Sequence, residues 1–115
     1  MIRLTRPTAP ESQVLRSVLQ LLSLHKAVAW AGRINSGAVF LTGEGGSSRY
    51  VRFNGMAGIS DIIGQLVDGR FLAIECKRKG QKPTELQQGF LDQVARHGGV
   101  AFCARSADDV VAVLG

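Results

Sequence analysis

The segment Arg70–Arg78, RFLAIECKR, restricts the fold more than any other stretch of this chain, because it begins apolar on both faces. Side chains alternate along a β-strand, so Phe71 and Ala73 share one face while Leu72 and Ile74 share the other. A strand that is apolar on both faces is typical of a sheet covered by helices. The segment therefore predicts an α/β domain.

The 115 residues are the length of one domain, and we treat residues 1–115 as a single unit. An N-terminal helix is predicted over residues 10–26, with its apolar stripe at i, i+3 and i+4 spacing. Short strands are predicted over 28–34, 38–42, 50–53 and 59–66, followed by the strand at 70–78. A helix from Pro83 to Gly98, a strand over 100–104 and a terminal helix from Ser106 complete the chain. Because a strand, a helix and another strand follow in succession, we expect a right-handed crossover that adds one parallel strand to an antiparallel meander.

Composition favours a partner that carries negative charge. Fourteen Lys and Arg against nine Asp and Glu give a net charge of +5, which is typical of nucleic-acid binding but also lies within the range that keeps small domains in solution. Aromatic residues make up only 6%, so extensive base stacking is not expected. The two cysteines form no C-x-x-C pair, which argues against a zinc site. The N-terminus lacks a stretch long enough for a signal peptide or a membrane span, and we expect a cytoplasmic protein.

An acid and a base, Glu75 and Lys77, lie two residues apart and therefore on one face of the predicted strand. The position of Asp61 relative to them depends on the hairpin loop. A two-residue loop, Asp68-Gly69, would place Asp61 opposite Cys76 and away from Glu75. A three-residue loop with Gly69 in the left-handed conformation would place Asp61 directly across from Glu75, and so would a bulge near Gly64. The sequence leaves these registers open.

Two facing carboxylates repel unless a cation lies between them. Mg²⁺ or Mn²⁺ would bind there through oxygen ligands, polarise a phosphate and activate water, and a neighbouring lysine could hold that water. The alternative is an ordinary solvated ion pair on a strand, which stabilises a protein by about 0–1 kcal/mol.

A basic cluster follows this strand directly and includes Arg78, Lys79 and Lys82. Beside a phosphodiesterase site it would contact phosphates, although such a run is also typical of a solvated loop. Arg49 and Arg52, near the glycine-rich stretch at 43–48, are weaker candidates of the same kind.

Four stretches, GISDIIG, GRFLAIECKR, KPTELQQGFL and GGVAFCARSADDV, together resemble the VRR-NUC domain of the PD-(D/E)XK nuclease superfamily, in its stand-alone phage or bacterial form. The resemblance runs from Glu11 to Val110 and implies a restriction-endonuclease-like core. Ser60 stands where many relatives have a proline before the aspartate.

The resemblance also implies roles for individual residues. Asp61 and Glu75 would be metal ligands, with the backbone carbonyl of Cys76 completing the set, and Lys77 would position the attacking water. Glu11 matches an acid of the first helix that binds the metal directly or through water. Gln87 matches a glutamine that reaches the active site, although its spacing from Thr84 also fits a capping box. Asn35 falls in a family-like stretch that lines the cleft.

The implied activity is metal-dependent endonuclease cleavage of DNA, on branched substrates such as four-way junctions and by a homodimer, in a bacterial or phage-infected cell. Two alternatives remain: a nucleic-acid-binding or protein-docking module without turnover, and a nuclease for flaps, single strands or RNA.

Overall fold

A four-stranded mixed sheet forms the centre of the computed structural model, which describes residues 8–34, 38–42, 48–52 and 56–115, with side chains described for 8–34 and 56–115. The helices are α1 (Glu11–Leu24), α2 (Glu85–Arg96) and α3 (Ala107–Leu114). The strands are β1 (Val28–Arg33), β2 (Ala38–Thr42), β3 (Ser48–Arg52), β4 (Ile62–Leu66), β5 (Phe71–Cys76) and β6 (Val100–Ala104). The α/β class is confirmed, with a sheet consistent with a restriction-endonuclease-like core.

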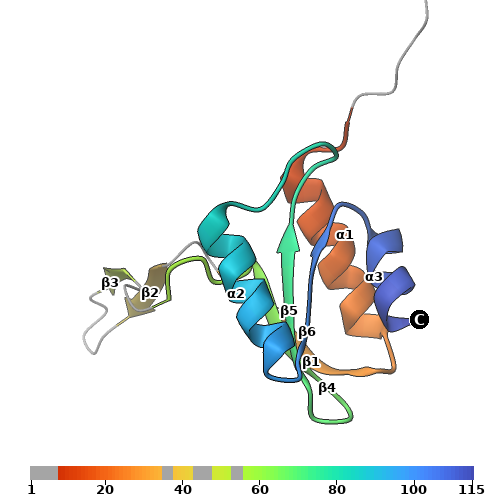
Figure 1. The fold of residues 1–115 in the computed structure, drawn as a ribbon. Helices are drawn as coiled ribbons and strands as arrows, with labels where there is room; N and C mark the ends of the chain where they lie inside the picture. Colours follow the sequence, from red (N-terminus) through yellow and green to blue (C-terminus); the bar gives the residue numbers. More distant parts are fainter. Residues whose placement is uncertain (1–7, 35–37, 43–47, 53–55) are drawn as a thin grey trace, which may run out of the picture.

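The sheet has the order β1-β4-β5-β6, in which β1, β4 and β5 are antiparallel and β6 is parallel to β5. The parallel crossover through α2 is therefore confirmed. The strands β2 and β3 pair only with each other among the described strands, as a hairpin that projects from the side of the sheet (Figure 1). The chain thus leaves the sheet after β1 and returns at β4, whereas the sequence predicted one continuous meander.

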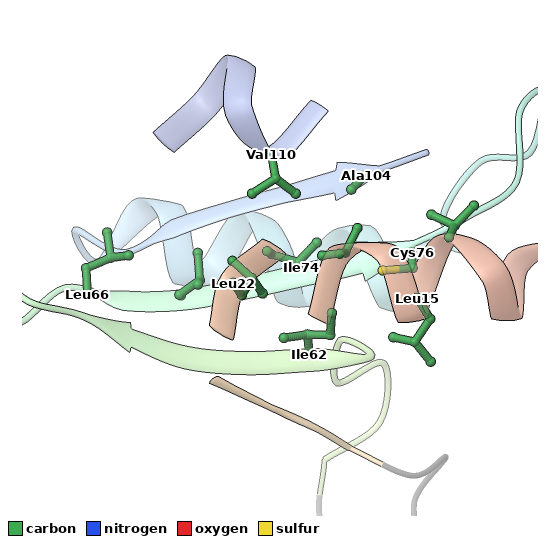
Figure 2. Packing of buried hydrophobic residues seen from close by; sticks show 11 residues of the cluster. Leu15, Leu22, Ile62, Leu66, Ile74, Cys76, Ala104 and Val110 are labelled. Carbon is green, nitrogen blue, oxygen red and sulfur yellow. The ribbon is translucent and has the colours of Figure 1, made fainter. Parts of the chain in front are cut away.

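The helices cover the two faces of the sheet unequally (Figure 1). α1 and α3 lie together on one face, and α2 lies on the other, over β5 and β6. The main core lies on the first face, where the buried side chains of α1 and α3 meet alternate residues of β4 and β5, as Figure 2 shows. Its residues include Val14, Leu15, Val18, Leu22, Ile62, Leu66, Leu72, Ile74, Cys76, Ala104 and Val110.

Local signals account for the helix ends. α1 begins after Pro10, whose carbonyl accepts hydrogen bonds from the N–H groups of Gln13 and Val14. α2 ends in a Schellman motif, in which Gly98 takes φ +91° and the Gly99 N–H donates to the Val94 carbonyl at 2.9 Å. No described helix has both the length and the hydropathy needed to cross a membrane.

Candidate active site

The β4–β5 hairpin has the register that brings two carboxylates together. Its loop is Val67-Asp68-Gly69, with Gly69 at φ +96° and the Leu66 N–H donating to the Arg70 carbonyl. Ile62 pairs with Ile74 and Ile63 with Ala73, so the same register sets Asp61 opposite Glu75. Of the registers that the sequence left open, the three-residue loop is the one observed. The described irregularity of pairing lies in β1, between Val28 and Trp30, and not in this hairpin.

Asp61 is held in place by hydrogen bonds from the backbone of two other segments. Its Oδ2 accepts a hydrogen bond from the Cys76 N–H at 2.9 Å, and its carbonyl accepts one from the Ile34 N–H at 2.7 Å. The preceding Ser60 is buried and donates from Oγ to the Ile62 carbonyl at 2.8 Å. These bonds fix the backbone on either side of the aspartate.

Glu75 lies in a buried and electrostatically unfavourable place. Its side chain is only 2% exposed, and Oε2 has no hydrogen-bond partner among the residues described by the structure. Burial raises the pKa of Glu75 to about 8, the adjacent Asp61 carboxylate adds to that rise, and Lys77 opposes it. A cation bound beside this carboxyl group would favour its ionised form.

Lys77 stands between two acids that come from different elements. Its Nζ lies 4.0 Å from Glu75 Oε1 and 3.9 Å from Glu11 Oε1, and its side chain is 16% exposed. Its backbone N–H donates to the Ala104 carbonyl of β6, which ties the residue to the end of the sheet. A cavity of about 320 Å³ opens beside these groups, lined by Pro10, Glu11, Lys77, Arg78 and Gln81. The first turn of α1 thus forms one wall of the site.

A hard divalent cation such as Mg²⁺ needs oxygen ligands, and the acidic side chains of this site supply some of them. No group of three or more His, Cys, Asp or Glu side chains within the described ranges is arranged to hold a metal ion. Mg²⁺, however, keeps several water ligands and commonly uses one or two carboxylates. The facing pair Asp61 and Glu75 fits that requirement, since one buried oxygen of Glu75 has no partner in the described part of the chain. Glu11 contacts Lys77, so it lies at the rim of this pair.

Gln87 occupies the capping box of α2. Its Oε1 accepts from the Thr84 N–H at 2.8 Å, and the Thr84 Oγ1 accepts from the Gln87 N–H at 3.3 Å. The structural role is therefore observed, and the catalytic role stays a prediction. The same turn packs against Gly58, where an added Cβ would meet the Leu86 carbonyl group. This contact fixes the loop before Asp61 against the start of α2.

The basic residues fall into two groups. Arg78, Lys79 and Lys82 are all exposed in the loop after β5. This loop is fastened to the end of β6, because Arg105 donates from Nε and Nη2 to the Gln81 carbonyl at 3.1 and 2.7 Å. No pattern in the sequence predicts that role of Arg105, which depends on two strand ends being adjacent. Arg49 and Arg52 belong to β3, but their side chains lie outside the described residues, as does all of Asn35.

Cys103 is a neighbour of the site that the sequence did not predict. It lies in β6 directly beside Glu75, on the same face of the sheet. Burial raises the pKa of its thiol. The parallel register alone makes it a neighbour of the acid pair.

Comparison with known proteins gives one finding for this chain. The VRR-NUC domain family matches over residues 10–108, which includes every residue of the acid pair, the lysine and the capping box. Comparisons with curated proteins and with solved structures found no match. Since the family match covers most of the chain, the protein belongs to the VRR-NUC domain family, a nuclease-type family.

Proposed function

We propose that this protein is a divalent-metal-dependent DNA endonuclease, with Mg²⁺ or Mn²⁺ as its cofactor. The observation that carries the proposal is the arrangement of Asp61 and Glu75 on one face at a strand end, beside Lys77. Glu75 is buried there with an oxygen that lacks a partner among the described residues, which is costly for a structural residue but useful for a ligand.

Each residue then has a defined task. Asp61, Glu75 and the backbone carbonyl of Cys76 would hold the metal, and Glu11 would bind through water from the rim. A bound Mg²⁺ or Mn²⁺ polarises the scissile phosphate and lowers the pKa of a water molecule. Lys77 would hold that water for in-line attack on phosphorus and offset the developing negative charge.

The reaction is hydrolysis. The water oxygen forms a bond to phosphorus, the bond from phosphorus to the 3′-oxygen breaks, and the 3′-oxygen takes up a proton. The products carry a 5′-phosphate and a 3′-hydroxyl. The exposed Arg78, Lys79 and Lys82 would contact the DNA backbone near the cut.

The finer substrate class is also part of the proposal. We infer branched DNA such as four-way junctions, cut by a homodimer whose two sites act on two strands. Support comes from the family membership and from the small size of the domain, which leaves one site per chain. Light scattering of the purified protein, alone and with a junction, measures the assembly directly.

The decisive experiment compares cleavage of four-way junction, flap, duplex and single-stranded DNA in Mg²⁺, Mn²⁺ or EDTA. We expect metal-dependent cutting that Lys77→Ala reduces at least a hundredfold while the affinity for DNA in EDTA changes little. Lys26→Ala is the matched control, because Lys26 is an exposed lysine beyond the far end of α1. Binding without cutting of any substrate in either metal would instead identify a non-catalytic DNA-binding module.

Metal binding is tested separately by isothermal titration calorimetry with Mn²⁺. Asp61→Asn should remove most of the heat of binding, since it neutralises one of the two facing carboxylates. An unchanged affinity for Mn²⁺ would refute the assignment of the ligands, whatever the activity.

A further inference from the structure

The loop that joins β5 to α2 lies beside the start of α1 (Figure 1). Its residues Lys77, Arg78 and Gln81 form one side of the cavity of about 320 Å³ at the candidate active site, and the first turn of α1 forms another. The same loop carries the exposed Lys79 and Lys82. The position of this loop therefore sets the shape of the cavity and the placement of the positive charges beside it.

Arg105, which follows β6, holds the middle of this loop. Its Nε and Nη2 both donate to the Gln81 carbonyl, at 3.1 and 2.7 Å. Within the described ranges, no other side chain from outside the loop forms a hydrogen bond with residues 78–82. The ends of the loop are fixed separately, by the bond from the Lys77 N–H to β6 and by the capping box of α2. Arg105 thus determines where the part of the loop between these ends lies.

Arg105 is itself fixed by the first turn of α3. Its backbone N–H donates to Asp109 Oδ2 at 2.8 Å, and the Asp109 N–H donates to Ser106 Oγ at 3.4 Å. The Arg105 residue is half-buried. The guanidinium therefore extends to the loop from a backbone that is tied both to the sheet and to a helix.

The contact suits arginine in particular. The guanidinium is planar and presents its N–H groups in a fixed geometry, so two of them converge on one oxygen, which the single ammonium of lysine does not reproduce. The acceptor is a neutral carbonyl, so the contact leaves the positive charge of Arg105 in place, unlike the ion pair of Arg70 with Asp68. Like charges repel along the basic loop, and Gly80, at φ +87°, adds backbone freedom. Without Arg105 we expect the loop to spread into solvent.

We propose that Arg105 is a positioning residue, which holds the basic loop so that Arg78, Lys79 and Lys82 meet the DNA backbone beside the candidate active site. The proposal rests on the proposed nuclease function for the identity of the bound polymer. It gives Arg105 a role in substrate affinity that acts through other residues.

The first test is a double-mutant cycle, measured in EDTA by fluorescence anisotropy with a labelled four-way junction. Arg105→Met should weaken binding about five- to tenfold and lower the slope of log affinity against log salt concentration by about 1–2, since each lost phosphate contact changes that slope by about 0.9. In a background with Arg78, Lys79 and Lys82 all replaced by alanine, the same substitution should weaken binding less than about twofold. Equal losses in both backgrounds would overturn the proposal, because Arg105 would then contact DNA itself or support the whole fold.

Two further variants separate the geometry of Arg105 from its charge. Arg105→Lys keeps the charge but loses the paired donors, so it should weaken binding nearly as much as Arg105→Met does. Binding by Arg105→Lys at the wild-type affinity would overturn the proposal. Arg70→Met is the matched control, because it removes an exposed arginine from the far end of β5. Its affinity should stay within about twofold of the wild type.

Hydrogen exchange followed by mass spectrometry tests the contact without DNA. Arg105→Lys should speed exchange in peptides that cover residues 78–82 and leave α1 unchanged, whereas unchanged exchange in the loop would refute the positioning role. Cleavage in Mn²⁺ should show a raised KM with little change in kcat, since Lys77 keeps its bond to β6. If losses of affinity depend on the loop but the wild type cuts no DNA, the nuclease function alone is refuted. If the wild type cuts and the losses are equal in both backgrounds, the positioning role alone is refuted.

Discussion

Replacing Gly58 with alanine should destabilise the protein more than an ordinary glycine substitution does. Gly58 has φ +78°, and an alanine Cβ there would lie 2.5 Å from the carbonyl carbon of Leu86 and closer still to its oxygen. Both atoms belong to the backbone in the first turn of α2, so no side-chain rotation can relieve the clash. Either the loop before Asp61 or the start of the helix must move.

The magnitude has two parts. A left-handed backbone costs an alanine about 1–2 kcal/mol. Overpacking against atoms that cannot rotate away adds about 1–3 kcal/mol. Gly69→Ala separates the two, because Gly69 has φ +96° and nothing within 4 Å of the added Cβ. We therefore expect a loss of about 2–5 kcal/mol for Gly58→Ala and only about 1–2 kcal/mol for Gly69→Ala.

Urea unfolding followed by circular dichroism measures both losses. The comparison requires that the free energy of unfolding has the same slope against urea concentration in the wild type and in the two variants. For a domain of this size, each 1 kcal/mol lowers the melting temperature by about 4 °C. Equal losses for the two variants would show that the close approach of Gly58 to α2 is not a real constraint. Because Gly58 precedes Asp61 by three residues, Gly58→Ala should also weaken Mn²⁺ binding, whereas Gly69→Ala should change it less.

Three further predictions concern protonation, capping and the thiols. In metal-free protein the pKa of Glu75 is raised from its ordinary value of 4.5 to about 8. Between these two pH values the folded state keeps a proton that the unfolded chain has lost. The free energy of unfolding should therefore fall as the pH rises from 4.5 to about 8. Glu75→Gln should flatten this fall in urea titrations, and an unchanged slope would contradict the assignment. Thr84→Ala removes the capping box and should cost about 1 kcal/mol in thermal unfolding, whereas a loss near zero would show that the box contributes little. Cys76 is buried with its pKa raised to about 12, so iodoacetamide should modify only Cys103 in the folded protein, as peptide mass spectrometry would show; equal labelling would contradict the burial.

The acid pair shows where sequence reasoning reached its limit. Alternation along β5 predicted correctly that Glu75 and Lys77 share a face, because that relation is local. Whether Asp61 joined them depended on one residue of loop length, which the sequence left open between two loops and a bulge. The left-handed Gly69 and the packing of Ile62 and Ile74 into the same core selected the three-residue loop. A shift of one residue would have turned Asp61 to the core face.

By itself, the sequence determined the features that depend on neighbours two to four residues apart: the alternation of β5, the capping box of α2 and the glycine stop after it. The order of its motifs also identified the VRR-NUC family, which the match over residues 10–108 confirmed. Only the tertiary structure decided which distant segments meet. It paired β1 with β4 around the β2–β3 hairpin, brought Glu11 within 3.9 Å of Lys77, and joined Arg105 to Gln81. These contacts arise because burying both faces of β5 fixes how the helices and the neighbouring strands pack around it, and no local pattern records that outcome.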